Sequence, residues 1–375
     1  MNHLIYLDNS ATTKIHPLVV QKMLPYLKEC YGNASSNYSI GICSKEALDF
    51  SRKRVASILH VDPEELYFTS GGSEADNMII KGIARKYQNK GKHIITSSIE
   101  HMAVLNSCHF LEKEGFEVTY LPVDKNGRIS LRQLEESIRE DTILISIMYV
   151  NNEIGTIEPI QEIGRIAKAH QVFFHTDAVQ AVGNLNIDVR SLNVDALSMS
   201  AHKFYGPKGV GVAYIKKGIL FDNLIDGGHQ EFSKRAGTEN VAGIVGLGEA
   251  ISLAYQNLEE EENKIRLMRN YLYEGLMKIS PDITLNGSME NRIAGNLNVS
   301  FPKILNENML LLLNMNQICV STGSACNSQA VEPSHVLKAI GCQNPDKAIR
   351  FSIGRNNTMR EMDQVLKVIK NIICK

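Results

Sequence analysis

Several features that would mark a well-known class of protein are missing from this sequence. Its seven cysteines are odd in number and include no CxxC pair, which argues against a disulfide framework and a four-ligand zinc site. No stretch reaches the ~18 continuous apolar residues that span a membrane, and the start, MNHLIYLDNSATT, lacks the basic region and long apolar run of a secretory leader. We therefore expect a cytoplasmic protein in a reducing compartment, without membrane contact.

An excess of charge of one sign is missing as well. Forty basic residues balance 41 acidic ones, and the two signs are interspersed, so the chain offers no electrostatic surface for nucleic acid. A small-molecule substrate is therefore favoured. The 375 residues exceed the size at which a single core usually suffices, so two domains are expected.

Strand-like and helix-like patterns alternate through the first part of the chain. After a strand over Leu4–Leu7, which could belong to either domain, and a helix over Ser44–Leu59, the expected strands are Leu66–Thr69, His93–Ser97, Glu117–Leu121, Ile143–Val150, Val172–Thr176, Ala196–Ser200 and Val210–Ile215. The helices between them are Glu74–Tyr87, Met102–Glu114, Leu131–Arg139 and Ile160–His170. Strands separated by helices predict an α/β fold with a mainly parallel sheet of about seven strands, covered on both faces.

The pattern changes after Asp226-Gly227-Gly228. One long charged helix is expected over Val241–Ile279 as the spine between two domains, and the acidic run Glu259–Glu262 is interpreted as its solvated face. Short strands and helices follow, and the amphipathic helix Met359–Ile373 closes the chain. We expect a large domain over residues 13–258 and a small α+β domain formed by residues 1–12 and 259–375.

The stretch LSMSAHKFYGPKGVG, which runs from Leu197 to Gly211, places a lysine where a strand ends. Lys203 lies beside His202 and just ahead of a Gly/Pro-rich loop. A lysine at the mouth of a strand is well placed to form a Schiff base with an aldehyde cofactor. The alternative is an exposed loop lysine, which describes most lysines, so the surrounding residues must decide.

Polar residues also follow the other expected strands. They form the groups Ser70–Ser73, Ser98–His101, Asn151-Asn152, Asp177–Gln180 and Ser200–Lys203. Because ligands of open α/β sheets bind outside the carboxyl ends of the strands, these groups should converge on one site.

Each group suits a part of a phosphorylated pyridine cofactor. Gly72 and Ser73 open a helix, where free N–H groups hold a phosphate, although an ordinary N-cap explains them equally well. Asp177 ends a buried strand and could pair with a protonated pyridine nitrogen, or else cap a turn or pair with a lysine. His101 could stack on the ring and shuttle protons, or be a structural histidine.

The motifs in order resemble those of one enzyme family. They are YLDNSATT, TSGGSEADN, SSIEHMAVL, VNNEIGTIEPI, HTDAVQAVG, SAHKFYGPKGVG, RAGTEN, STGSACNSQAVEPSHVLKAIG and IRFSIGR. Together they resemble the motifs of the NifS/IscS-type cysteine desulfurases of the class V aminotransferase family, which are fold-type I pyridoxal 5'-phosphate enzymes. The matching motifs extend through nearly the whole chain.

The resemblance implies a role for each matching residue. Lys203 would be the Schiff-base lysine, Asp177 the partner of the pyridine nitrogen and His101 the ring-stacking acid/base. The remaining cofactor ligands would be Gly72, Ser73, Ser200 and His202 at the phosphate, Gln180 and Asn152 at the side of the ring, and Thr238 at the phosphate of a second subunit in a homodimer.

The resemblance also implies the chemistry. Cys326, in a loop of small and polar residues able to move, would take the sulfur of L-cysteine as a persulfide and release L-alanine. Arg350 would bind the substrate carboxylate, with Asn152 nearby, and its alternation with Phe351 predicts that it faces the cleft. No metal is expected beyond Cys326 as a transient ligand of an iron–sulfur cluster, and the other six cysteines are interpreted as small core residues.

Sulfur would pass to an acceptor protein for iron–sulfur cluster assembly or tRNA thiolation. Many relatives carry a longer tail after the motif IRFSIGR and use it at their acceptor interface. In this sequence the motif is followed by the expected helix Met359–Ile373 and not by such a tail, so the resemblance implies no particular acceptor. Two alternatives remain open: another lyase or transaminase of the same fold, such as a selenocysteine lyase, and a non-catalytic sulfur carrier or scaffold that uses Cys326 alone.

Overall fold

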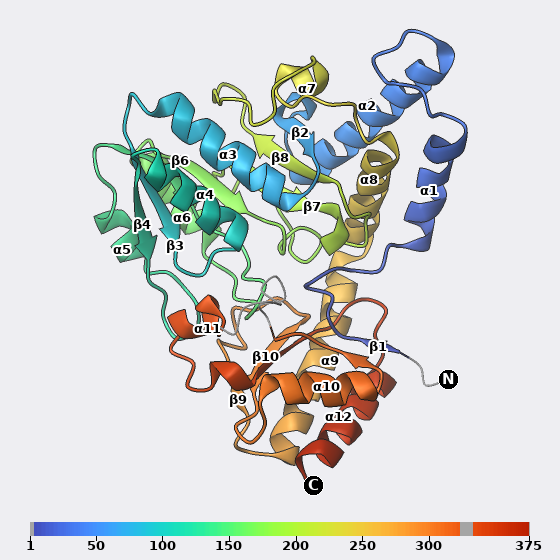
Figure 1. The fold of residues 1–375 in the computed structure, drawn as a ribbon, viewed down its shortest axis with the longest axis vertical. Coiled ribbons are helices and arrows are strands. Elements are labelled where there is room, and N and C mark those ends of the chain that lie inside the picture. The colour runs from blue at the N-terminus through green and yellow to red at the C-terminus, as the bar shows by residue number, and fades with distance from the viewer. Residues whose placement is uncertain (1–3, 323–332, 375) are drawn as a thin grey trace.

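A seven-stranded sheet forms the centre of the larger lobe of the molecule (Figure 1). The computed structural model describes residues 4–322 and 333–374. The strand order is β2-β8-β7-β6-β5-β3-β4, and the strands are β2 (Leu66–Thr69), β3 (His93–Ser97), β4 (Glu117–Leu121), β5 (Thr142–Ser146), β6 (Phe173–Asp177), β7 (Ala196–Ser200) and β8 (Gly211–Ile215). Only β8 runs antiparallel to its neighbours β2 and β7, while the other pairs in this sheet are parallel. The expected mainly parallel sheet is confirmed.

Helices cover both faces of this sheet. They are α2 (Ser39–Leu59), α3 (Gly72–Tyr87), α4 (Met102–Lys113), α5 (Leu131–Glu136), α6 (Ile160–Ala169) and α8 (Val241–Gln256). Consecutive residues of one strand enter different cores: Ile94 packs with side chains of α3 and α4, whereas Ile95 packs with side chains of α2, α6 and α8. Because side chains alternate along a strand, a strand covered on both faces is buried at consecutive positions, as all five residues of β3 are.

The smaller lobe has its own core and its own sheet. Strand β10 (Asn296–Ser300) lies between β9 (Thr284–Leu285) and β12 (Ala348–Ser352), and the helices are α9 (Leu258–Ile279), α10 (Asn306–Met315), α11 (His335–Ala339) and α12 (Met359–Ile373). Strand β1 (Ile5–Tyr6) pairs in parallel with β11 (Ile318–Cys319), and Ile5 is buried in the core of this lobe. The first strand, whose pattern taken alone could belong to either domain, therefore lies in the smaller lobe.

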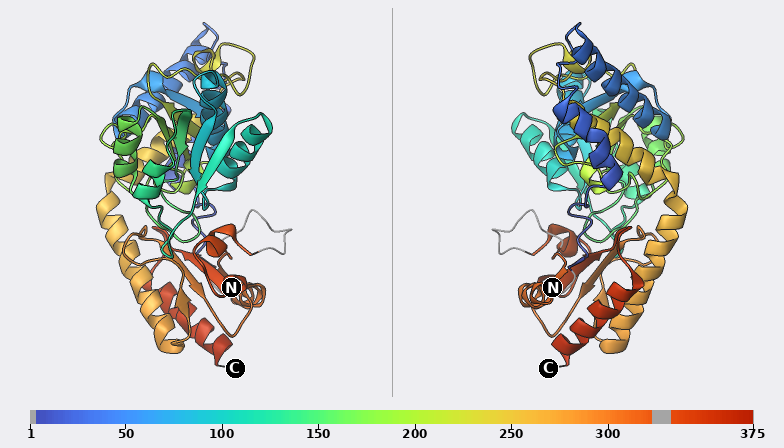
Figure 2. Two further views of the ribbon diagram at one scale, coloured as in Figure 1. Left: turned by 90° about the vertical axis from the view of Figure 1, so that its left-hand side faces the viewer. Right: turned by 90° about the vertical axis from the view of Figure 1, so that its right-hand side faces the viewer.

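The long helix expected over residues 241–279 is two helices. Asn257 has φ −135° and ψ 40°, outside the helical region, so α8 ends before it and α9 begins after it. An asparagine leaves the helix readily because its side chain competes for backbone hydrogen bonds. The acidic residues Glu259–Glu261 then occupy the first turn of α9, where the helix dipole favours negative charge. The helices still connect the two lobes along one side of the molecule (Figure 2).

Some elements were not expected from the sequence. Helix α1 (Pro17–Lys28) and the short α7 (Gln230–Ser233) were missed, and single 3-10 turns cover Pro63–Glu65, Ala201–Lys203 and Pro345–Lys347. The apolar residues of α1 lie partly on its exposed side, so the helix shows no clean apolar face. Within the described residues, no helix is long and apolar enough to span a membrane.

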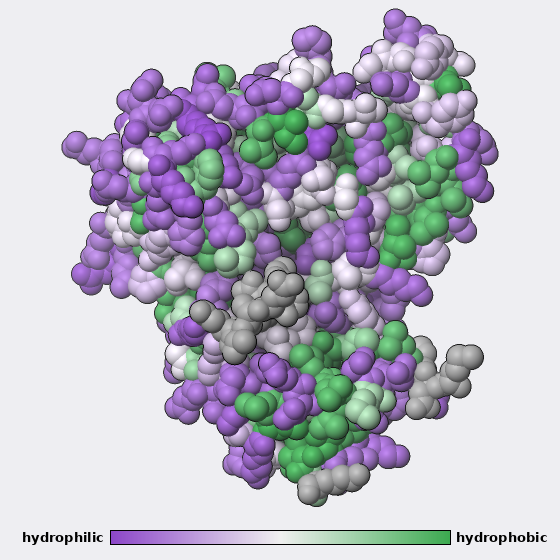
Figure 3. All heavy atoms as spheres, viewed as in Figure 1, coloured by the Kyte–Doolittle hydropathy of each residue, from purple (hydrophilic) through white to green (hydrophobic). Residues whose placement is uncertain are grey.

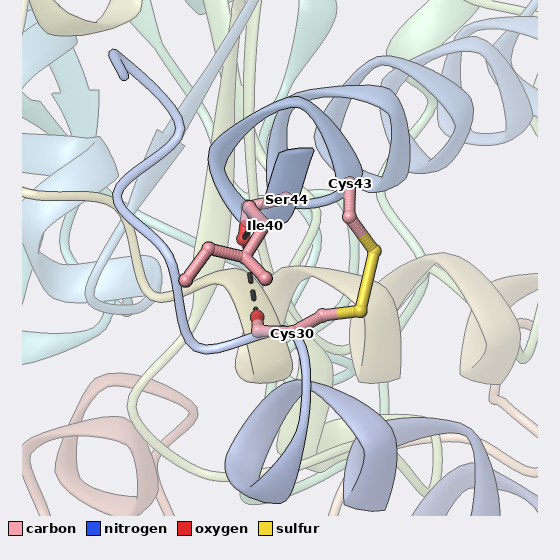
Figure 4. Close-up of a disulfide and its surroundings, with 4 residues drawn as sticks. All are labelled: Cys30, Ile40, Cys43 and Ser44. Atoms are coloured by element: carbon pink, nitrogen blue, oxygen red, sulfur yellow. Dashed lines mark hydrogen bonds between the residues drawn. A yellow bond between two sulfur atoms is a disulfide. The ribbon is translucent and has the colours of Figure 1, made fainter. Parts of the chain in front are cut away.

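The expectation of unbonded core cysteines is wrong for two of them. Cys30, just after α1, and Cys43, in the second turn of α2, form a disulfide with a Cα–Cα distance of 6.2 Å (Figure 4). The chain doubles back between the two helices, and Ser44 Oγ lies 3.1 Å from the carbonyl oxygen of Cys30, so residues 13 apart meet without a CxxC spacing. Cys108 is buried as expected, whereas Cys374 is exposed.

Candidate active site

Ten of the predicted site residues line one cavity of about 310 Å³. The edge of the large sheet at this cavity faces the smaller lobe (Figure 1). The ten residues are Gly72, Ser73, His101, Asn152, Asp177, Gln180, Ser200, His202, Lys203 and Arg350. Asp177 ends β6, Ser200 ends β7 and Lys203 follows directly in a 3-10 turn. The predicted convergence at the carboxyl ends of the strands is therefore confirmed.

The amino end of α3 provides a place for a phosphate. Among the residues that the structure describes, no side chain caps this helix, whose N-cap residue is Gly71, so its first N–H groups are available to an anion. A Cβ atom at Gly72 would lie 2.5 Å from Cγ2 of Val179, so the backbone can approach the cavity closely only with glycine there. Burial and the charge of Lys203 lower the pKa of His202 to about 4, which keeps its imidazole neutral at pH 7. These features fit a phosphate group.

Asp177 is a buried carboxyl group that suits a cationic partner. It is 5% exposed, and its Oδ1 accepts a hydrogen bond of 2.9 Å from the Val179 N–H. Burial raises the pKa of Asp177, while the nearby His101 and Lys203 act in the opposite direction. Asp76, which is 1% exposed, also lines the cavity, and burial together with the charge of Asp177 raises its pKa. A protonated ring nitrogen would favour the ionised form of Asp177.

His101 combines the two alternatives that the sequence left open. Its Nδ1 accepts a hydrogen bond of 3.1 Å from the Ala103 N–H, so it caps α4, and its ring lines the cavity. Since Nδ1 is an acceptor, the proton of the neutral ring is assigned to Nε2. Burial lowers the pKa of His101. A neutral, fixed imidazole therefore borders the cavity.

The segment after β1 was missed as part of the site. Lys203 Nζ donates hydrogen bonds to the carbonyl oxygens of Ser10, at 2.5 Å, and Ala11, at 2.9 Å. Gln180 Nε2 donates to the same Ser10 oxygen at 2.9 Å, and Thr12 Oγ1 lies 3.1 Å from Nδ1 of His202. The motif YLDNSATT is the sequence signal for this segment, although the resemblance predicts no role for its individual residues.

Arg350 reaches the cavity from the smaller lobe. Its neighbours Ile349 and Phe351 lie in the core of that lobe, as the alternation predicted, while Arg350 lines the cavity. Its Nη1 donates to the carbonyl oxygen of Asn152 at 3.0 Å, and its Nη2 forms a 2.7 Å ion pair with Asp8 Oδ1. Arg350 thus pairs with an acidic neighbour, and it also faces the predicted site.

One described residue of the predicted site lies away from this cavity. Thr238 is exposed in the loop after α7 and is not among the described residues that line this cavity. The side chain of Glu231 anchors this loop, since it accepts hydrogen bonds of 2.7 Å from Arg52 Nη2 and from the Phe68 N–H. Cys326 lies outside the described residues.

Comparisons with known proteins identify relatives along nearly the whole chain. A family model described as aminotransferase class-V matches residues 5–365. The cysteine desulfurase IscS of Methanosarcina thermophila is 55% identical over 100% of this chain and 93% of its own, and that of Clostridium botulinum strain Hall is 52% identical over 100% and 95%. Among solved structures, a NifS-like protein has a TM-score of 0.94 at 39% identity over 99% of this chain and 100% of that one. A structure described as SspA in complex with cysteine has a TM-score of 0.83 at 37% identity, over 94% and 100%.

Proposed function

Because the chain belongs to the aminotransferase class-V family, we propose that it is a cysteine desulfurase that uses pyridoxal 5'-phosphate. It converts L-cysteine to L-alanine and keeps the sulfur as a persulfide on Cys326. The observation that carries the proposal is the single cavity that joins Lys203, Asp177 and His101 to an uncapped helix end and to Arg350.

The cofactor would be held at three places. The N–H groups at Gly72 and Ser73, with the side chains of Ser200 and His202, would hold the phosphate. Asp177 would keep a proton on the ring nitrogen, and Lys203 would hold the aldehyde carbon. When bound, pyridoxal 5'-phosphate supplies an electron sink for the bonds at the substrate's α-carbon.

The side chains of this protein would then divide the work. Arg350 binds the substrate carboxylate, and Lys203, once free, moves a proton at the α-carbon. His101 holds or returns a proton at its Nε2. The Cys326 thiolate attacks the substrate sulfur, the carbon–sulfur bond breaks with its electron pair left on carbon, and protonation there gives the methyl group of alanine.

A second copy of the chain would complete the site. Thr238 is exposed and lies outside its own cavity, as a residue that serves a partner's phosphate would. Apolar side chains gather on the surface over α1 (Figure 3), where Leu18, Val20, Leu24 and Leu27 are exposed. An exposed apolar surface of this kind is typical of a protein interface. We therefore propose that the protein forms a homodimer. We also propose that it acts in the cytoplasm and passes its sulfur to an acceptor protein of iron–sulfur cluster assembly or tRNA thiolation.

The proposal is tested with purified protein and the Lys203→Ala variant. The parent protein should show a visible absorbance band, and borohydride should fix the cofactor covalently to Lys203. It should also release alanine from L-cysteine. In Lys203→Ala, borohydride should fix no cofactor. A reduced adduct on another lysine would overturn the assignment of Lys203, and a protein without bound cofactor would favour the sulfur-carrier alternative.

A further inference from the structure

The ion pair between Arg350 and Asp8 joins the proposed substrate-binding residue to the N-terminal segment. The guanidinium of Arg350 is buried, with a side-chain exposure of 2%, and its Nη2 lies 2.7 Å from Asp8 Oδ1. Two acceptors therefore hold its two terminal nitrogens, Asp8 at Nη2 and the Asn152 carbonyl at Nη1. Nε of the same guanidinium has no acceptor in the described part of the chain.

Backbone hydrogen bonds fix Asp8 on both sides. Asp8 forms a parallel bridge with Ser352 of β12, two residues after Arg350. The Ser352 N–H donates to the carbonyl oxygen of Leu7 at 2.7 Å, and the Asn9 N–H donates to the carbonyl oxygen of Ser352 at 3.2 Å. The backbone of Asp8 is thus held beside β12, which keeps its side chain within reach of Arg350.

Asp8 approaches the guanidinium from outside the cavity. Arg350 and Asn152 are among the residues that line the cavity, whereas Asp8 is not found among those lining residues in the described chain. In the described chain, the cavity side of Arg350 is therefore not lined by Asp8. The carboxylate of Asp8 can set the orientation of the Arg350 guanidinium, because charge-assisted hydrogen bonds to a planar guanidinium are directional.

From this geometry we propose that Asp8 is a positioning residue for substrate recognition. Its carboxylate holds the guanidinium of Arg350 so that the remaining N–H groups face the carboxylate of an α-amino acid. The inference rests on the proposed function, since it assumes that Arg350 binds substrate. It assigns a role to the Asp of YLDNSATT, and it makes the N-terminal segment part of the substrate site.

The test compares acid and ester substrates in the holoenzyme. Asp8→Ala should raise KM for L-cysteine, and the Kd for L-alanine read from the cofactor absorbance, by about ten- to a hundredfold, because a charge-assisted hydrogen bond is lost. The kcat for L-cysteine should stay within about threefold. The kcat/KM for L-cysteine methyl ester, which has no carboxylate for Arg350 to bind, should change little.

Asp8→Asn separates position from charge. The amide oxygen of the asparagine can still accept a hydrogen bond from Nη2 of Arg350 and keep the guanidinium oriented. The Kd for L-alanine should therefore rise less than in Asp8→Ala, by about two- to fivefold. The matched control is Asp282→Ala in the same lobe, where the carboxylate forms an exposed ion pair with Lys303. Cofactor content should be equal in all variants.

Three results would overturn the proposal. An equal loss with the acid and the ester would show a general structural role, and tighter binding of L-alanine in both variants would show that Asp8 competes with substrate. Unchanged constants in both variants would remove Asp8 from recognition. If Asp8→Ala does not fold, the acid-to-ester comparison in Asp8→Asn decides. Failure of the proposed function is distinguishable, because the parent protein itself would then give no spectral response to L-alanine.

Discussion

The loop that carries Thr238 depends on one buried carboxylate, and its removal should be measurable. Glu231, Phe232 and Ser233 are consecutive residues with φ of 45°, 57° and 64°, a left-handed conformation that costs non-glycine residues about 1–2 kcal/mol each. The loop keeps this conformation while Glu231 is bonded at 2.7 Å both to Arg52 and to the Phe68 N–H. We therefore expect Glu231→Gln to release the loop.

The size of the effect follows from burial. Side-chain exposure is 9% for Arg52 and 3% for Glu231, so the variant leaves a buried guanidinium without its counter-charge. Such a loss costs about 3–5 kcal/mol. With an unfolding entropy of about 2.1 cal/mol/K per residue, the 375 residues convert this into a Tm lower by about 4–6 °C.

Thermal unfolding with and without cofactor, together with hydrogen exchange of residues 227–240, measures the effect. The matched control is Glu136→Gln, which removes an exposed ion pair of 2.7 Å with Arg132 and should cost less than about 1 kcal/mol. If Thr238 serves the partner's phosphate, cofactor affinity should fall along with loop protection. An unchanged Tm and unchanged exchange in Glu231→Gln would refute the reasoning.

Three further outcomes are expected. Cys326→Ser should bind cofactor and substrate but form no persulfide and release no alanine, because a hydroxyl is a poor nucleophile toward sulfur. Normal release of alanine would show that another group attacks the substrate sulfur. In mixed dimers, Thr238→Val on one chain and Lys203→Ala on the other should place both lesions in one site and leave the second active, while equal activity in the same-chain combination would argue against a shared site. Replacement of both Cys30 and Cys43 by serine should lower the free energy of unfolding by up to about 3 kcal/mol, because the disulfide is lost. Denaturant titration of this variant and of the oxidised and reduced parent protein measures the change, and equal midpoints of the oxidised and reduced parent would contradict it.

The convergence of the site could be predicted because it depends on a periodic signal. The short strands that end at Asp177 and Ser200 belong to the part of the chain in which strand-like and helix-like patterns alternate, so the parallel sheet follows from the sequence. In a parallel sheet the carboxyl ends share one edge. Asp177, Ser200 and Lys203 were therefore placed correctly without any long-range information.

Contacts between distant segments could not be predicted in the same way. Lys203 binds carbonyl oxygens of Ser10 and Ala11, more than 190 residues earlier in the chain, and Asp8 lies 342 residues before Arg350. These segments have no periodicity, because two-residue strands and turns leave none. The break between α8 and α9 was missed for a related reason, since one residue outside the helical region does not interrupt the apolar pattern on its two sides.

The disulfide between Cys30 and Cys43 closes the connection between α1 and α2 into a covalent ring. Tyr31 and Tyr38 lie inside that ring and are 72% and 56% exposed, so the ring presents cleavable bonds to a protease. A single cut there would not free the N-terminal piece that supplies Asp8, because sulfur would still tether it to the rest of the chain. The cut protein should run as one species on a non-reducing gel and lose a fragment of between about 30 and 43 residues only when a thiol is added.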